Sequence, residues 1–121
     1  MQSFQYVILL SFRILRFMRI KYTLSVNCSL VLHGCWLYSK LIKQDFSRTA
    51  IMNFIEYFNN DRITRYFNVL LKRGFVIDSG KTYSGFPLYN ISSQVNDMVK
   101  EIEESYNKEM YIFCNKYNVE L

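Results

Sequence analysis

The sequence predicts a mainly α-helical fold with one small β-hairpin. Apolar residues recur at helical spacing along most of the chain, and glycine and proline are scarce, at four and one of 121 residues. Only the segment 75–91 departs from this pattern, with two strand-like runs around a glycine-containing turn. The length suits one domain, and half of the residues are apolar. We therefore expect a single folded domain over residues 1–121.

Basic residues are concentrated in the first two thirds of the chain. Residues 1–81 hold twelve Lys or Arg and four acidic residues, whereas residues 82–121 hold three basic and six acidic residues. This asymmetry predicts a basic surface that could meet a polyanion, although a merely solvated surface accounts for it equally well.

The first predicted helix covers residues 3–20 and is apolar around most of its circumference. Its polar stripe consists of Gln2, Gln5, Arg13, Arg16 and Arg19. Such a helix has to be covered, and in so short a chain we expect a partner subunit to cover it. The competing interpretation is an interfacial membrane helix whose arginines reach to the polar surface.

The N-terminal apolar run predicts neither a signal peptide nor a membrane span. It lacks a basic n-region and a small-residue cleavage site. Arg13 interrupts it well before the roughly 20 apolar residues that a spanning helix needs. The three cysteines form no C-x-x-C pair, and their odd number argues against a disulfide framework. We therefore expect a cytoplasmic protein.

Two helices are predicted between residues 25 and 58. Ser25 can cap a second helix that runs to about Leu41, and Gly34 in this helix allows another helix to approach closely. Its expected buried seam consists of Val26, Leu30, Leu37 and Leu41. A third, short helix begins near Ser47 or Arg48, and its apolar residues are Ile51, Phe54, Ile55 and Phe58.

The fourth predicted helix is amphipathic, with a basic outer face. Residues 59–61 supply a turn and an N-cap, and Gly74 follows the expected end of the helix at Arg73. The positions expected to anchor it in the core are Ile63, Phe67 and Leu70. The side chains expected to point outward are Arg62, Thr64, Arg65, Asn68 and Lys72. Two helices joined by a short turn, the second amphipathic and basic, predict a helix-turn-helix. Taken alone, the pattern also fits a solvated surface helix.

A hairpin and a long helix complete the chain. Residues 75–77 and 88–91 are strand-like, and the turn-rich run 78–87 lies between them. Ser92 or Ser93 can cap a final helix that reaches about residue 117. Its apolar residues step by three or four positions, a rhythm that suits packing against another helix. They are Val95, Val99, Ile102, Tyr106, Met110, Phe113 and Tyr117. A helix-turn-helix followed by a hairpin predicts a winged helix, whose second helix enters the major groove of DNA.

The segment 63–92 resembles the MarR family of winged-helix transcription regulators. The likeness rests on Ile63-Thr64-Arg65, on Leu70, on the run KRGFVI at 72–77 and on the run LYNIS at 88–92. Family members commonly have there a β-branched residue, Ser and Arg, then a leucine, a basic pair, Gly and a short strand. A second strand with a Leu-Thr-like end then opens a long helix. The hairpin of that family usually carries an Asp-x-Arg turn, whereas Lys81 is the only basic residue among residues 79–85. We therefore expect hairpin contacts that are weaker or confined to phosphates.

The resemblance implies a homodimeric, sequence-specific DNA-binding regulator of transcription that acts on a near-palindromic site. Residues 25–91 would form the DNA-binding core, and the helices 3–20 and 93–117 would dimerise. A small aromatic effector could bind between these parts, although core packing explains the many aromatic residues equally well.

Several side chains can be given roles in binding double-stranded DNA. Arg62 and Arg65 suit guanine, Asn68 suits adenine, and Thr64 suits phosphates or bases. The cations expected to contact phosphates, which fix register without reading sequence, are Lys40, Lys43 and Arg48. Lys72 and Lys81 complete the expected DNA-binding set.

No catalytic residue, metal or cofactor is expected. Cys28 and Cys35 lie on one face of the second helix, but His33 is rotated away, so the three cannot converge on one metal. We expect both cysteines to be buried. Neither has a basic neighbour in the sequence that would lower its pKa, so no reactive thiol is predicted. No phosphate-binding glycine loop or nucleophile elbow is present. The main alternative to a DNA-binding regulator is a winged helix that serves as a protein-interaction module without sequence-specific DNA binding.

Overall fold

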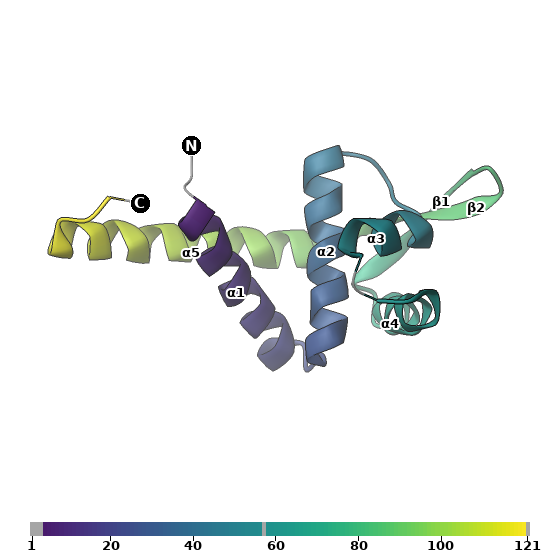
Figure 1. Cartoon of the computed structure of the whole chain (residues 1–121), viewed down its shortest axis with the longest axis horizontal. Helices are drawn as coiled ribbons and strands as arrows, with labels where there is room; N and C mark the ends of the chain where they lie inside the picture. Colours follow the sequence, from purple (N-terminus) through teal and green to yellow (C-terminus); the bar gives the residue numbers. More distant parts are fainter. Residues whose placement is uncertain (1–3, 57, 121) are drawn as a thin grey trace.

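The computed structural model describes residues 4–56 and 58–120. Over these residues the chain forms five helices and a two-stranded antiparallel hairpin (Figure 1). In chain order the elements are α1 (Phe4–Lys21), α2 (Val26–Ile42), α3 (Arg48–Ile55), α4 (Asn60–Lys72), β1 (Val76–Tyr83), β2 (Phe86–Ile91) and α5 (Ser93–Tyr117). The mainly helical fold with a small hairpin is therefore confirmed. The expected first residue of the first helix, at position 3, and Gln2 lie outside the described residues.

Side-chain caps fix the starts of four helices where the sequence predicts them. Ser25, Ser47, Asn59 and Ser92 each accept a hydrogen bond from the backbone N–H three residues further on. Such a bond satisfies one of the amide groups that have no partner inside the helix. At the other end of α4, Gly74 adopts a φ of 75°, which is the left-handed conformation that ends many helices.

The central helix α2 has packed neighbours on two sides. Figure 1 shows α1 and α5 on one side of it and α3, α4 and the hairpin on the other. Its buried residues are Cys28, Ser29, Val31, Leu32, His33, Gly34, Cys35 and Trp36. These residues surround most of the circumference of its middle turns, because a helix that is enclosed on two sides has no single buried stripe.

The expected buried seam of α2 is wrong. Val26 and Leu41 are 52% and 66% exposed, and Leu30 and Leu37 are only partly buried. Val26 and Leu41 lie at the two ends of the helix, beyond the turns that its neighbours enclose. A periodic apolar pattern cannot reveal this, since it carries no information on how far the neighbours extend.

Gly34 allows the close helix approach that the sequence predicts. A Cβ atom at this position would lie 2.7 Å from Cδ1 of Ile55 in α3, which is closer than carbon atoms pack. α3 can therefore lie directly against the backbone of α2.

The hairpin is longer than expected. β1 and β2 pair from Val76↔Ile91 to Tyr83↔Phe86, so the run 78–87 is mostly strand and not a turn-rich tip. Ser84 and Gly85, with φ values of 50° and 80°, form the tip as in a type I′ turn. At the other end, Phe46 exchanges two backbone hydrogen bonds with Tyr89, at 2.9 and 2.7 Å. The chain before α3 thus holds the base of the hairpin.

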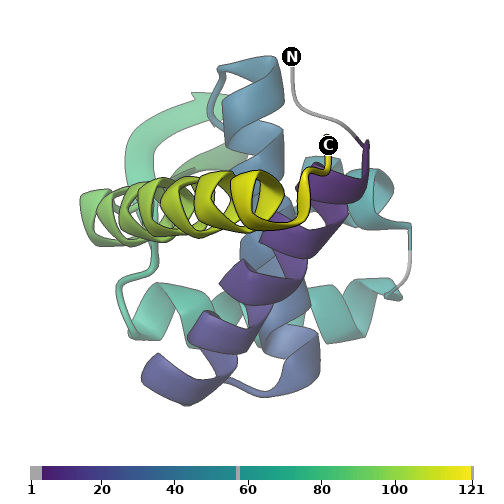
Figure 2. The same ribbon diagram turned by 90° about the vertical axis from the view of Figure 1, so that its left-hand side faces the viewer.

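The terminal helices cross each other and are only partly covered. Figure 2 shows α1 and α5 crossing in front of α2. α1 buries Tyr6, Leu10, Ile14 and Met18, whereas α5 buries Val95, Met98, Val99 and Tyr106. The exposed large apolar residues of the last three turns of α5 are Tyr111, Ile112, Phe113 and Tyr117. The last residues of the periodic apolar pattern predicted for this helix therefore do not pack against any other part of the described chain.

None of the described helices combines the length and the apolar character that crossing a membrane would require.

Candidate nucleic-acid interface

The inner face of α4 is fixed in the core, as the sequence predicts. Ile63, Phe67 and Leu70 are completely buried. The ring of Phe67 packs edge-on against Phe46 and Tyr89, with centroids 6.1 and 4.9 Å apart. These contacts join α4 to the segment before α3 and to the hairpin, so that the helix has one defined orientation.

The edge of α4 is held by α2. Tyr66 accepts a hydrogen bond from Nδ2 of Asn27 at 3.0 Å, and its ring packs against Phe58 at 5.3 Å. Burial of the apolar face and this polar contact leave only the opposite face of α4 free.

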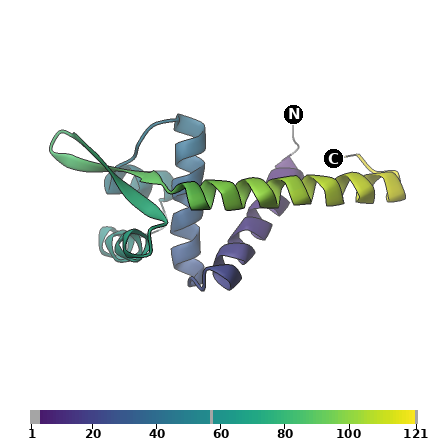
Figure 3. The ribbon, with the colours of Figure 1, turned by 180° about the vertical axis from the view of Figure 1, so that it is seen from behind.

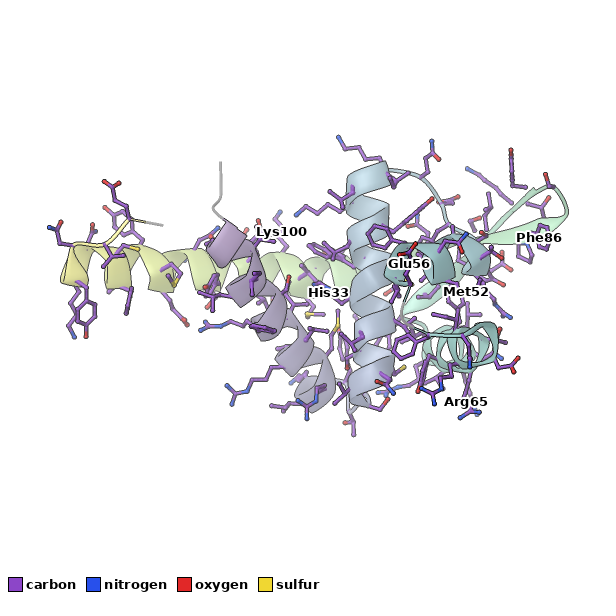
Figure 4. All side chains as sticks on the ribbon, in the orientation of Figure 1. His33, Met52, Glu56, Arg65, Phe86 and Lys100 are labelled. Carbon is purple, nitrogen blue, oxygen red and sulfur yellow. The ribbon has the colours of Figure 1, made fainter. Side chains whose placement is uncertain are left out.

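That free face carries most of the side chains predicted to point outward. Arg62, Arg65, Asn68 and Lys72 are exposed, and Thr64 is half-buried. Figure 4 shows Arg65 extending from the outer side of α4. Guanidinium groups on a fixed, exposed helix face can donate bidentate hydrogen bonds to guanine or to phosphate.

Arg48 forms contacts inside the chain that the sequence does not reveal. Its guanidinium donates a hydrogen bond to Oδ1 of Asn68 at 2.9 Å. The same group lies 5.5 and 5.7 Å from the ring centroids of Phe67 and Tyr89. Arg48 therefore connects the start of α3 to α4 and to the hairpin, and it orients the amide of Asn68. Its role as a phosphate contact stays a prediction.

Lys40 and Lys43 are not brought to α4. Lys43 follows α2 and is exposed, whereas α4 packs near the start of α2 through Asn27. At 1.5 Å per residue these two places are about 24 Å apart along the helix. Lys40 faces α5, with its Nζ 3.5 Å from a carboxylate oxygen of Glu103 and 4.8 Å from the ring centroid of Trp36. Neither lysine shares a face with the outward residues of α4.

The hairpin lies at the same end of the molecule as α4 (Figures 1 and 3). Lys81 is exposed in an irregular part of β1. Two aromatic side chains at the tip, Tyr83 and Phe86, are 74% and 63% exposed. The composition of residues 78–87 is typical of a turn and did not predict this pair, although the two aromatic side chains that flank Ser84-Gly85 were an available signal.

Cys28 and Cys35 are buried as expected. Burial raises the pKa of Cys28 to about 11 and also raises the pKa of Cys35, so neither thiol ionises at neutral pH. Burial lowers the pKa of His33 to about 4. Across residues 4–56 and 58–120, no three His, Cys, Asp or Glu side chains gather where a metal ion could bind.

Comparison with protein-family models and with curated protein sequences finds no match for this chain. The resemblance to the MarR family therefore stays a prediction from the residues that carry it.

Proposed function

We propose that this chain is a sequence-specific, double-stranded DNA-binding regulator of transcription. The observation that carries the proposal is the fixed orientation of α4. Three completely buried side chains hold one face of this helix, while two arginines project from the other beside a hairpin. This arrangement is what a winged helix needs to insert a helix into the major groove. The net charge of +5 favours approach to a polyanion.

Each outward residue of α4 has a chemistry that suits DNA. Arg62 and Arg65 would donate to O6 and N7 of guanine. Asn68, whose amide Arg48 already orients, keeps its Nδ2 donor and one lone pair of Oδ1 for adenine. Thr64, which lies between Arg62 and Arg65, and Lys72, at the end of this row, would contact the DNA backbone.

The terminal helices support a homodimer as the active form. An open groove of about 970 Å³ lies between α1 and α5. Its apolar lining includes Leu9, Phe12 and Ile20, and the uncovered end of α5 offers Phe113 and Tyr117 as matching apolar side chains. A two-fold dimer through these helices would present two copies of α4 to half-sites about 34 Å apart. We also propose that this groove could bind a small aromatic effector.

The dimer is tested by sedimentation of the double variant Phe113→Glu/Tyr117→Glu beside the wild type. Both side chains are exposed in the single chain, so the variant should fold and sediment as a monomer. A wild type that is itself monomeric at high concentration would contradict the dimer.

DNA binding is tested by selecting duplexes from a random pool. The affinity of the protein for the most enriched duplex is then measured by fluorescence anisotropy. Arg65→Ala should weaken specific binding about 10-fold to 100-fold, because a bidentate contact to guanine contributes about 1–3 kcal/mol. Lys100→Ala is the matched control: it also removes one exposed positive charge, but from α5, away from Arg65 in Figure 4.

The same titration separates the proposal from a protein-interaction module. Specific DNA binding should survive competitor DNA and weaken steeply with salt, because bound counterions are released. Failure to enrich any duplex, or equal affinity of Arg65→Ala and wild type, would refute the assignment and favour a protein partner.

A further inference from the structure

The guanidinium of Arg48 is held by two aromatic rings. It lies 5.5 Å from the ring centroid of Phe67 in α4 and 5.7 Å from that of Tyr89 in β2. Aromatic faces attract a cation and restrict where it can lie. Both rings are buried, so this support is itself fixed. The core therefore sets the position of the Arg48 guanidinium.

This fixed cation determines the orientation of the Asn68 amide. Nη2 of Arg48 donates a hydrogen bond to Oδ1 of Asn68 at 2.9 Å. A guanidinium has donors and no acceptor, so the amide must turn its oxygen, and not its nitrogen, towards Arg48. A half-turn of the amide would break this hydrogen bond and bring two sets of donors together. Arg48 thus decides which end of the amide is the oxygen end.

The same geometry leaves little of Arg48 for a DNA phosphate. Its Nε, which shares one edge of the guanidinium with Nη2, is buried and has no hydrogen-bond partner among the described residues. Bidentate contacts to phosphate use two parallel N–H groups along one edge. Because Nε is buried and Nη2 already donates to Asn68, that edge is closed to a phosphate. Arg48 is therefore better placed to act through Asn68 than on the DNA backbone.

Asn68 lies on the face of α4 that would meet the bases. It is exposed and follows the exposed Arg65 by three positions, so the two side chains are neighbours on the helix surface. In the major groove, adenine presents the acceptor N7 beside the donor N6, and an asparagine amide matches this pair with Nδ2 and Oδ1. The order of these groups across the groove reverses when adenine changes strand. An amide that can turn over reads both orders, whereas a fixed amide reads one.

We propose that Arg48 is a positioning residue that makes Asn68 read adenine on only one strand of the duplex. By holding Oδ1, Arg48 distinguishes an A·T from a T·A base pair at one position of each half-site. Only one lone pair of Oδ1 is used by Arg48, so the other remains for N6 of adenine. This inference rests on the proposed DNA binding and adds the source of specificity at this position.

The test compares four duplexes that differ only at the base pair read by Asn68. That position is the one whose base preference is lost when Asn68→Ala selects duplexes from the same random pool. The wild type should prefer A·T to T·A there by about 10-fold to 100-fold, as expected for a bidentate contact. Arg48→Met keeps an apolar chain over the two rings but has no donor, so it should bind these two duplexes almost equally. Arg48→Lys retains a donor and should restore part of the preference.

The ratio of affinities separates this role from two others. Partial unfolding of a variant lowers its apparent affinity for all four duplexes by one factor and leaves the ratio unchanged. Loss of a phosphate contact also weakens all four alike, and it makes the slope of log affinity against log salt shallower by about 0.9. Lys100→Met is the matched control: it removes an exposed charge from α5 and should keep the wild-type preference.

A second comparison shows whether Arg48 acts through Asn68. In an Asn68→Ala background, Arg48→Met should leave the relative affinities for the four duplexes unchanged, because the residue that Arg48 positions is already absent. A further change of base preference in this background would show that Arg48 contacts DNA by itself and would contradict the inference.

The remaining results also decide between the two proposals. An A·T preference that survives in Arg48→Met, a uniform loss over the four duplexes, or an Asn68→Ala variant that keeps every base preference would overturn the inference and leave DNA binding by α4 in place. A wild type that enriches no duplex would overturn the proposed function and this inference with it.

Discussion

His33 makes the stability of this protein depend on pH in a predictable direction. His33 lies in the middle turns of α2, which are packed on two sides, and it is 7% exposed. Among the described residues its Nε2 has no hydrogen-bond partner. Burial lowers its pKa from 6.5 to about 4, because the charged imidazolium would lose its hydration. The unfolded chain therefore binds the proton more tightly than the folded chain.

The sign and size of the effect follow from linkage. Because the folded pKa is depressed, the stabilisation is fully present above pH 6.5 and is lost as the pH falls from about 6.5 towards 4. Lowering the pKa of His33 from 6.5 to about 4 corresponds to about 3 kcal/mol, which is a large share of the 5–15 kcal/mol that stabilises most domains.

The assay is urea unfolding of wild type and His33→Leu from pH 7.5 to 4.5, at one protein concentration because the proposed dimer would also contribute to stability. Acidic groups affect both proteins alike, so the difference isolates His33. The variant should lose less stability on acidification, by about 2 kcal/mol at the lower end. Since His33 is the only histidine, its single imidazole resonance reports the folded pKa directly. Parallel pH profiles, or a resonance that titrates near 6.5, would refute the reasoning.

Two further variants test the packing of α3. Gly34→Ala should lower the free energy of unfolding by about 1 kcal/mol, because its Cβ would lie 2.7 Å from Ile55 and overpacking costs more than helix propensity returns. In an Ile55→Ala background the same change should be stabilising, and thermal melts that show the same sign in both backgrounds would contradict the close approach. Arg48→Ala and Asn68→Ala should show a coupling energy of about 1 kcal/mol in a double-mutant cycle of unfolding, since each removes the same hydrogen bond. Strict additivity would mean that this contact contributes nothing.

The parts of the fold that local chemistry determines could be predicted from the sequence. The caps at Ser25, Asn59 and Ser92 act within one turn, and the anchor positions of α4 follow from helical periodicity. Both signals lie within a few residues of the structure that they specify, so the start and the buried face of α4 were predicted correctly and its end to within one residue.

The parts of the fold that depend on contacts between residues far apart in the sequence could not be predicted. Arg48 and Asn68 are 20 residues apart, and no spacing rule joins them. Lys40 was expected near DNA, but its direction depends on Glu103 in α5. The run 78–87 has turn composition, yet most of it pairs as strand, and the base of this hairpin is paired with Phe46, 43 residues before Tyr89 in the sequence. In each case the deciding contact is formed only after the chain has folded.

α2 contacts the elements at both ends of the molecule, so a movement of this helix is transmitted from one end to the other. The terminal helices rest on one side of it, and α4 rests on the other at the interaxial distance of packed helices, about 10 Å. A rotation of α2 by about 10° would thus carry α4 through about 2 Å, enough to break hydrogen bonds to a base edge. A change in the crossing of α1 and α5 that turned α2 would therefore also move the outer face of α4 at the other end of the molecule.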